Sequence, residues 1–248
     1  MTARVCMTVD VEDFYDGMAE LGEVLDRPAD ARSGLSGLAS VLEADRGAEV
    51  TLFVVGNYAD RVHDELEALL ARGHEVASHG PDHGHLPEDP AELVEWLRTG
   101  RAMIEDRLQR PVTGFRSPRF DVPRTLELVH YRALLAEAGF RYVSDRMVLG
   151  SASPVRELPV LTRYRFPLGG GSYQRLLPGA AVDAAVGTSP EPVVLYYHSY
   201  DFGATLPEVS KIRSLALAKQ LVGRRRVTGL FSRLLHRYGS EACRRVAQ

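Results

Sequence analysis

The sequence predicts an α/β fold built on a mainly parallel sheet. Short apolar runs alternate with longer stretches whose apolar residues recur at helical spacing, which is the pattern of strands joined by crossover helices. Polar residues suited to chemistry lie at or just beyond the ends of several of these runs. With 248 residues, 45% of them hydrophobic, the chain is long enough for one barrel-sized domain, which we expect to span residues 1–248.

Several short runs are predicted to be strands. They are mostly apolar and of strand length, and most of them are separated by segments with helical periodicity, so the strands are expected to pair in parallel. In chain order the predicted strands are 4–9, 50–55, 75–78, 112–116, 141–144 and 193–198.

Helices are predicted between these strands, most clearly at 60–72, 90–108 and 123–138. In the first of them Val62, Leu66, Leu69 and Leu70 recur at helical spacing. Gly or Pro marks an end of each helix. The segment 151–190, which is rich in Gly and Pro, breaks the alternation, so we expect irregular loops or short β pieces there.

The C-terminal segment, residues 207–248, is locally basic and helical in pattern. Its apolar residues recur at helical spacing with arginines between them, and they are Val227, Leu230, Phe231, Leu234 and Leu235. This pattern favours a terminal helix packed on the domain. The alternative is a peripheral contact with an anionic membrane through the arginines and the apolar face.

Composition excludes some functional classes. A net charge of -3 gives no general attraction to nucleic acid, and the two cysteines, Cys6 and Cys243, suggest no disulfide framework. The first apolar run is too short for a signal sequence, and no run of about 18 apolar residues occurs. We therefore expect a cytoplasmic protein, with the inner face of the membrane as an alternative location.

The polar residues at the strand ends are Asp10, His79, Arg116, Asp145 and His198. In parallel barrels and open α/β sheets, ligands bind at the carboxyl ends of the strands. Five polar positions from five strands therefore predict a functional site at this edge of the sheet.

A divalent-metal site is predicted at His79 and His83, which are four residues apart. Zinc accepts two neutral imidazoles and one carboxylate while keeping a position open for water. The carboxylate comes from the acidic cluster after the first strand: Glu12 if the chain stays extended, because alternate residues share a side with Asp10, or Asp13 if the backbone turns. The extended arrangement is slightly favoured. Two structural histidines on a loop are the alternative to a metal site.

Five motifs in order resemble the polysaccharide deacetylase family, also called NodB-homology or carbohydrate esterase family four. The resemblance covers roughly residues 4–205, and its motifs are Thr8-Val-Asp-Val-Glu-Asp13, Thr51-Leu-Phe-Val-Val-Gly56, Ser78-His-Gly-Pro-Asp-His83, Gly114-Phe-Arg-Ser-Pro118 and Leu195-Tyr-Tyr-His198. Together with Gly169-Gly-Gly-Ser-Tyr-Gln-Arg-Leu-Leu-Pro178, they look most like the branch associated with bacterial exopolysaccharide clusters.

The resemblance implies a distorted (β/α) barrel with about seven parallel strands. It also implies a metal-dependent hydrolase that removes the N-acetyl group from an amino sugar in a glycan or glycan precursor. The metal would be Zn²⁺, with Co²⁺, Mn²⁺ or Ni²⁺ as alternatives.

The same resemblance implies catalytic roles for four residues. Asp10 matches the family's catalytic base, and Arg116 matches the arginine that holds this carboxylate ionised and oriented. His198 matches the general acid, although Ser199 stands where most relatives have proline. Asp145 occupies the place of the acid that pairs with that histidine.

Two aromatic residues in loops near the predicted site, Tyr173 and Phe202, are candidates for stacking on a sugar ring. Other functions remain open. One is hydrolysis of a cyclic amide or imide, as on the allantoinase-like side of the superfamily. The other is a catalytically silent glycan-binding or lipid-binding module.

Overall fold

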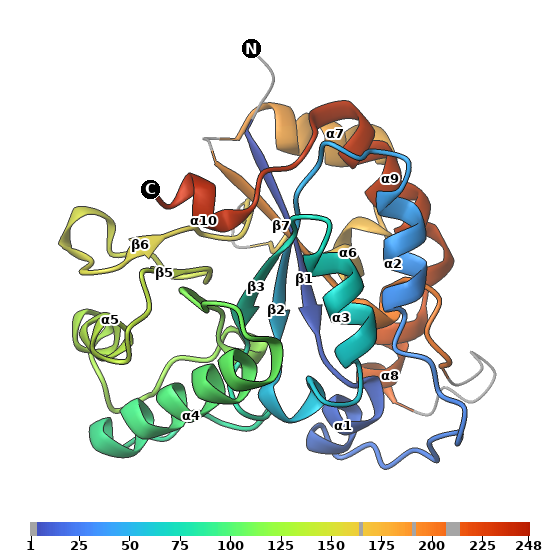
Figure 1. Cartoon of the computed structure of the whole chain (residues 1–248). Coiled ribbons are helices and arrows are strands. Elements are labelled where there is room, and N and C mark those ends of the chain that lie inside the picture. The colour runs from blue at the N-terminus through green and yellow to red at the C-terminus, as the bar shows by residue number, and fades with distance from the viewer. Residues whose placement is uncertain (1–3, 164–165, 190–191, 207–213) are drawn as a thin grey trace.

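The computed structural model describes residues 4–163, 166–189, 192–206 and 214–248 (Figure 1). Within them one sheet has seven strands in the order β6-β5-β4-β3-β2-β1-β7, and every neighbouring pair is parallel. The strands are β1 (Val5–Val11), β2 (Thr51–Val54), β3 (Glu75–Ser78), β4 (Gly114–Phe115), β5 (Tyr142–Val143), β6 (Arg156–Glu157) and β7 (Val193–His198).

The sheet curls until its two edges approach each other. Val160, just after β6, forms a parallel bridge with Val194, and Gly170 forms another with Tyr196, so the segment after β6 lies against β7. The predicted distorted (β/α) barrel with about seven parallel strands is confirmed. The two edges meet through isolated bridges and not through a continuous ladder.

Helices surround the curled sheet (Figure 1). The helical prediction at 90–108 has the bounds of α4, because Asp89 caps the backbone N–H groups of Ala91 and Glu92 and Pro90 occupies the first turn. The α-helices are α1 (Phe14–Glu20), α2 (Leu35–Leu42), α3 (His63–Leu70), α4 (Pro90–Leu108), α5 (Leu128–Glu137), α6 (Gly171–Gln174), α7 (Gly179–Gly187), α8 (Leu215–Leu221), α9 (Val227–Tyr238) and α10 (Cys243–Val246). The short 3₁₀ turns are η1 (Gly56–Tyr58), η2 (Pro118–Phe120), η3 (Gly150–Ala152), η4 (Ser199–Asp201) and η6 (Arg224–Arg226).

The expectation for 151–190 was only partly right. The segment contains the short β6, but it also contains α6 and α7. Its glycines and prolines misled the prediction because Gly171 and Pro178 stand at helix starts, where they interrupt no helical hydrogen bond.

The alternation of β1 divides its residues between two cores. Val5, Met7, Val9 and Val11 pack in the large cluster with the surrounding helices. Cys6 packs in a second cluster with residues of β2, β3, β5 and β7, inside the curled sheet. Because side chains alternate with period two, Asp10 shares the inner side with Cys6.

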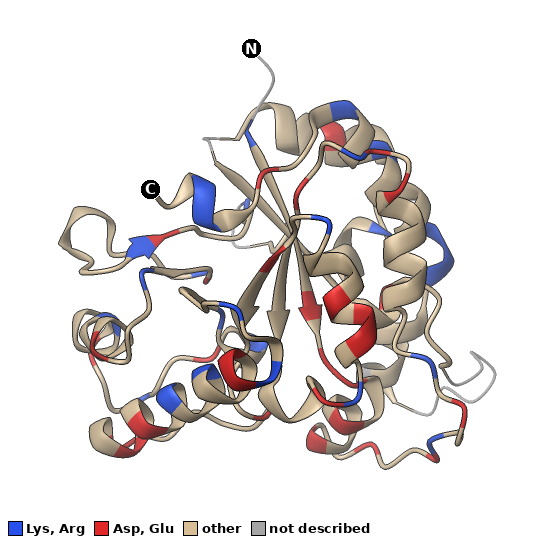
Figure 2. Cartoon of the chain, viewed as in Figure 1, with Lys and Arg blue, Asp and Glu red and all other residues tan. Residues whose placement is uncertain are grey.

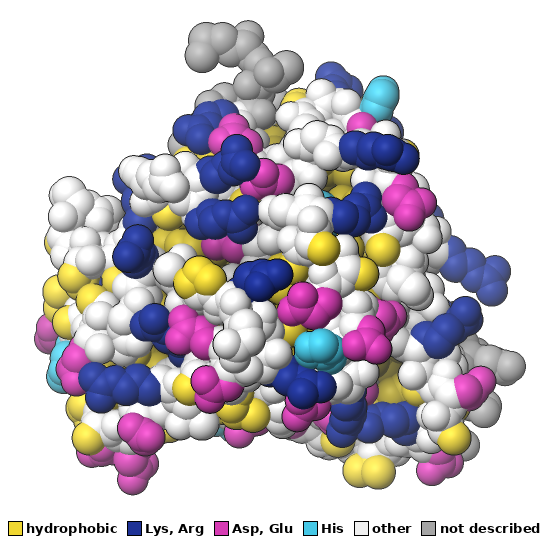
Figure 3. Space-filling view, in the orientation of Figure 1, with side chains coloured by type: hydrophobic (Ala, Val, Ile, Leu, Met, Phe, Trp, Pro, Cys, Tyr) yellow, Lys and Arg dark blue, Asp and Glu magenta, His cyan; other side chains and the backbone are white. Residues whose placement is uncertain are grey.

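The C-terminal helix α9 packs on the domain, as the pattern favoured. All five apolar residues named for it are buried. Its apolar face is therefore not free to enter a membrane, and residues 207–213 of the predicted basic segment lie outside the described residues. Among the helices described, none is both long and apolar enough to span a bilayer. Basic and acidic side chains are interspersed over the face seen in Figure 3.

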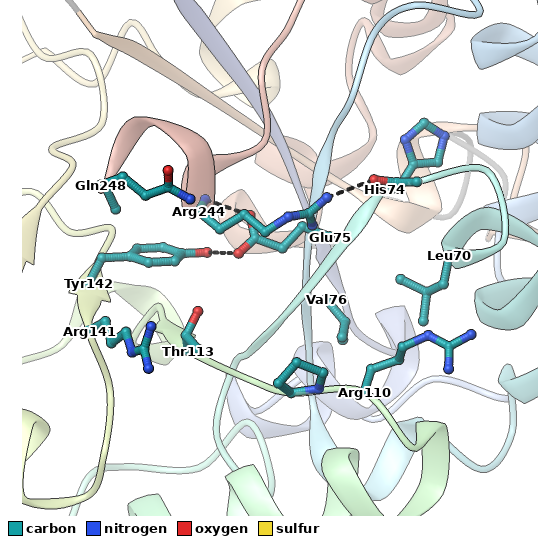
Figure 4. A pocket seen from close by; sticks show the side chains of 13 residues that line it. Leu70, His74, Glu75, Val76, Arg110, Thr113, Arg141, Tyr142, Arg244 and Gln248 are labelled. Atoms are coloured by element: carbon teal, nitrogen blue, oxygen red, sulfur yellow. Dashed lines mark hydrogen bonds between the residues drawn. The ribbon is translucent and has the colours of Figure 1, made fainter.

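The amino end of the barrel is covered by α10 (Figure 4). The backbone N–H of Cys243 donates to Thr51 Oγ1 over 2.8 Å, and that of Arg244 donates to Glu75 Oε2 over 2.9 Å. Tyr142 also donates to Glu75, and burial raises the pKa of this carboxyl.

Cys6 and Cys243 are free, buried thiols. A cavity of about 520 Å³ lies beside this network, and His74 lines it.

His74 should make the fold sensitive to acid. Its side chain is buried, Nδ1 accepts from the Val50 backbone N–H, and burial, aided by the charges of Arg72 and Arg244, lowers its pKa to about 4. The unfolded chain, with an ordinary pKa of about 6.5, binds this proton first as pH falls, so stability is lost between about pH 6.5 and 4. His74→Asn keeps an acceptor without titrating. The free energy of unfolding, measured with urea at pH 7 and pH 5, should fall less in this variant than in the wild type.

The control is His130→Asn, which removes an exposed histidine on α5. It should keep the wild-type pH dependence. An equal loss of stability in wild type and His74→Asn would contradict the role given to His74.

Candidate active site and metal centre

The polar residues at the carboxyl ends of the strands converge on one side of the barrel. Asp10 in β1 is in register with His198, the last residue of β7, and His79 directly follows β3. Figure 2 shows acidic colour at the arrowhead of β1, at this end. The site therefore lies at the end opposite to α10.

Three potential metal ligands are close together. Ligand atoms of Glu12, His79 and His83 all lie within 4.8 Å of one another. Glu12 Oε2 is 2.6 Å from His83 Nε2 and 3.7 Å from His79 Nε2. One carboxylate and two imidazoles form a donor set that suits zinc and similar divalent ions.

The other nitrogen of each imidazole has a partner that orients the ring. His79 Nδ1 lies 2.8 Å from the carbonyl oxygen of Arg116, so Nδ1 carries the hydrogen and Nε2 keeps its lone pair. His83 Nδ1 lies 3.0 Å from Glu20, whose carboxylate also pairs with Arg119. Such outer partners are typical of histidines that bind metals.

Glu12 and Asp13 have different surroundings. Asp13 caps α1 by accepting from the N–H groups of Tyr15 and Asp16, and it forms an ion pair with Arg27 at 2.6 Å. The chain stays extended to Val11, so Glu12 continues on the side of Asp10. The structure therefore places Glu12, and not Asp13, beside the two histidines.

The donor set fits a bound cation. Glu12 is buried, and its Oε2 pairs with His83 Nε2 at 2.6 Å. Burial opposes charge at both Glu12 and His83, but their mutual attraction outweighs it, lowering the pKa of Glu12 and raising that of His83. Burial lowers the pKa of His79, which favours the neutral ligand form. The site thus already favours positive charge next to Glu12.

Asp10 is held by a buried arginine. Arg116 Nη1 donates to Asp10 Oδ1 over 2.6 Å and to Thr8 Oγ1 over 2.8 Å, and Nη2 donates to Ser144 Oγ over 2.7 Å. The guanidinium also lies over the ring of Phe53, 4.1 Å from its centroid. These contacts fix the position of the Asp10 carboxylate inside the barrel.

His198 faces the same group of residues. Its Nε2 lies 3.8 Å from Glu12, and its ring stacks on Tyr200 with centroids 4.7 Å apart. Asp201 Oδ2 is 3.7 Å from His198 Nδ1 and accepts the His198 backbone N–H over 3.1 Å. Burial alone would lower the pKa of His198, but Asp201 and the other nearby carboxylates outweigh it and raise the pKa.

The expected pairing of Asp145 with the histidine is not found. Asp145 is buried against Arg132, at 3.2 Å, and accepts the Arg146 backbone N–H. A buried carboxylate needs a cation, and Arg132, which also binds Glu157, supplies it. The acid beside His198 is Asp201, which the sequence reasoning did not select. Its signals in the sequence are its position three residues after His198 and the aromatic-acidic pair that it forms with Tyr200.

A pocket of about 390 Å³ joins these residues. Asp10, Glu12, the three histidines and Tyr173 line it. Phe202 does not, because its side chain is buried in the core against Tyr197 and Phe231. The prediction that Phe202 stacks on a sugar was therefore wrong. Phe120, Tyr196 and Arg146 line the pocket and were missed, although the period-two alternation of β7 places Tyr196 on the side of His198.

The geometry predicts that Glu12 and Asp13 differ in metal binding. Glu12→Gln removes the charged ligand and should weaken Zn²⁺ binding by roughly 100-fold or more. Asp13→Asn keeps a good helix cap and should leave the affinity unchanged. Competition titration against a chromophoric chelator measures both. The reverse ranking would place the metal on Asp13.

Comparisons with known proteins agree with this architecture. The polysaccharide deacetylase family matches residues 34–143, which include His79, His83 and Arg116. A domain of unknown function, DUF3473, matches residues 136–248, which include His198. Asp10 and Glu12 lie outside both matches. No curated protein sequence matches the chain.

Solved structures share the fold at low sequence identity. A putative polysaccharide deacetylase from Mycobacterium smegmatis is 19% identical, with a TM-score of 0.66, and the alignment covers 99% of this chain and 89% of that one. A probable polysaccharide deacetylase from Pseudomonas aeruginosa is 15% identical, with a TM-score of 0.55 over 96% and 93% of the chains.

A CE4 family pseudoenzyme from Bacillus anthracis also shares the fold. It is 10% identical, with a TM-score of 0.57 over 100% of this chain and 66% of that one. Fold alone therefore does not decide activity. The sequence match to the polysaccharide deacetylase family covers residues 34–143, and the solved structures show that the chain shares their fold.

Proposed function

We propose that the protein is a metal-dependent hydrolase that removes the N-acetyl group from an amino sugar in a glycan or glycan precursor. The observation that carries the proposal is a single pocket that combines three groups. It is lined by a donor set suited to a metal ion, by a further carboxylate and by a further histidine. The carboxylate, Asp10, is fixed by Arg116, and the histidine, His198, has its own carboxylate neighbour in Asp201. Amide hydrolysis requires a base and an acid placed together in this way.

The chain's own residues supply both proton transfers. A divalent cation held by Glu12, His79 and His83 would polarise the acetyl carbonyl and a water molecule. Asp10 accepts a proton from the attacking water, and Arg116 keeps the carboxylate pointing into the pocket. His198 donates its proton to the departing amine, and Asp201 stabilises the protonated imidazole. The products are acetate and the free amino sugar.

Zn²⁺ is the metal we propose, with Co²⁺, Mn²⁺ and Ni²⁺ as alternatives, since two imidazoles and a carboxylate accommodate each of them. The form of the first motif and the Gly169–Pro178 stretch support a role in bacterial exopolysaccharide synthesis.

Acetate release tests the proposal. The Zn²⁺-loaded protein should release acetate from N-acetyl amino sugars, and a chelator should abolish the release. Asp10→Asn should lower kcat by about 10²- to 10⁴-fold, the usual contribution of a general base. Asp13→Asn is the matched control and should keep wild-type activity.

Two alternatives have distinct outcomes in the same assay. Opening of a cyclic amide or imide, with no acetate from any sugar, would assign the allantoinase-like activity. Intact metal and sugar binding without any turnover would assign a silent binding module, which the fold of a known pseudoenzyme makes a concrete alternative.

Asp201 should act through His198. Asp201→Asn removes the charge that raises the pKa of His198, so kcat should fall roughly tenfold and its alkaline limb should move to lower pH. Metal affinity should stay at the wild-type value. A pH–rate profile measured beside a metal titration checks both. A lower kcat with an unmoved alkaline limb would mean that Asp201 only supports the fold.

A further inference from the structure

Arg146 differs in its ion pairs from Arg119, the other arginine that lines the active-site pocket. Arg119 pairs with Glu20 and Asp121. In the part of the chain that the structure describes, no carboxylate lies within ion-pair distance of the Arg146 guanidinium. The pocket therefore contains a cation whose charge the protein does not neutralise directly.

The Arg146 side chain is nevertheless held in place. Its guanidinium lies over the ring of Phe120, 4.6 Å from the centroid, and donates to the Tyr196 hydroxyl over 3.4 Å. Phe120 and Tyr196 contact each other edge to face, with centroids 4.9 Å apart. A guanidinium stacked on an aromatic ring is restrained before a ligand arrives, which lowers the entropic cost of binding.

The backbone that presents Phe120 is unusual. Arg119 and Phe120 have φ values of 55° and 59°, in the left-handed region that bulky residues seldom adopt. Contacts on both sides retain this turn: Ser117 Oγ donates to the Asp121 carbonyl over 2.6 Å, and Arg119 Nε pairs with the Asp121 carboxylate. Strain of this kind is concentrated at functional sites. This turn places the Phe120 ring within reach of two guanidiniums, that of the buried Arg116 at 5.6 Å and that of the pocket-lining Arg146 at 4.6 Å from the ring centroid.

We infer that Arg146 binds an oxyanion on the substrate, so that the amino sugar deacetylated here carries a negative charge near its acetamido group. The inference rests on the proposed function. A guanidinium binds phosphate and carboxylate oxygens in the same planar, bidentate manner. The oxyanion is therefore either a phosphate ester on the sugar or the carboxylate of a uronic acid.

Apart from Arg146, the exposed residues that line the pocket are apolar, so Arg146 is the rim residue that can select an anionic substrate. Leu21, Phe166 and Leu176 line the pocket and are 49%, 45% and 59% exposed. They cannot bind an anion, and Arg119, the other arginine that lines the pocket, is already paired with Glu20 and Asp121. Arg146 is thus the residue through which an anionic sugar can be distinguished from a neutral one.

The test compares three substrates of similar size with the Zn²⁺-loaded protein: N-acetylglucosamine 1-phosphate, the methyl glycoside of N-acetylglucosaminuronic acid, and the methyl glycoside of N-acetylglucosamine. Wild type should have a higher kcat/KM on at least one of the two anionic sugars than on the neutral one. The preferred anionic sugar identifies the source of the charge.

Arg146→Gln should lower the anionic-to-neutral ratio of kcat/KM by roughly 10- to 100-fold, as expected for a lost hydrogen bond to a charged group. Arg146→Lys, which keeps the charge without the planar fork, should retain part of the preference. Arg141→Gln, at the exposed residue beside the cavity at the opposite end of the barrel, should leave the ratio at the wild-type value.

Failure of the inference and failure of the proposed function give different results. Acetate release with no preference for anionic sugars, or a preference that survives Arg146→Gln, overturns the inference alone. If no substrate releases acetate, the proposed function fails, and calorimetric binding of the same three sugars to the Zn²⁺-loaded protein then tests Arg146 directly. Anionic binding that is lost in Arg146→Gln would support the inference, and equal binding by both proteins would overturn it.

Discussion

The buried contact between Arg116 and Asp10 is the interaction on which the site depends. The guanidinium also binds Thr8 and Ser144, and the Arg116 carbonyl accepts the hydrogen bond that orients His79. One residue thus connects β1, the ends of β4 and β5, and a metal-type ligand. Removing one partner of such a buried pair typically costs about 3–5 kcal/mol, because the other charge stays unpaired. Stability and catalytic geometry are therefore coupled at this residue.

Much of the fold and the centre of the site could be predicted from the sequence, for local reasons. Strand periodicity identified β1 and β7, and the same period-two alternation placed Glu12 on the side of Asp10. Motif spacing brought together the two histidines. These features depend on neighbouring residues along one element, so the sequence displays them directly.

The parts that the sequence did not reveal depend on contacts between distant segments. Phe202 reads as a loop aromatic, but Tyr197 and Phe231 enclose it. Asp145 lies at a strand end like the other site residues, yet Arg132, thirteen positions away, binds it. Arg146 gains its significance because no carboxylate of the described residues lies within ion-pair distance of its guanidinium, and no sequence pattern encodes that. Partner choice among buried charges is decided by packing in three dimensions.

Because the barrel closes incompletely, the pocket is lined by two kinds of residue. Some stand on the continuous sheet, and others stand on the segment that follows β6. Asp10, His79 and His198 stand on strands β1, β3 and β7 or directly after them, and these strands belong to one continuous hydrogen-bonded ladder through β2. Phe166 and Tyr173 lie on the segment whose described residues pair with the β7 backbone through isolated bridges. Part of the pocket wall is therefore held less firmly by backbone pairing than the strands that carry the reacting groups. The residues that would contact the substrate are in this way structurally separated from the residues that would carry out the chemistry.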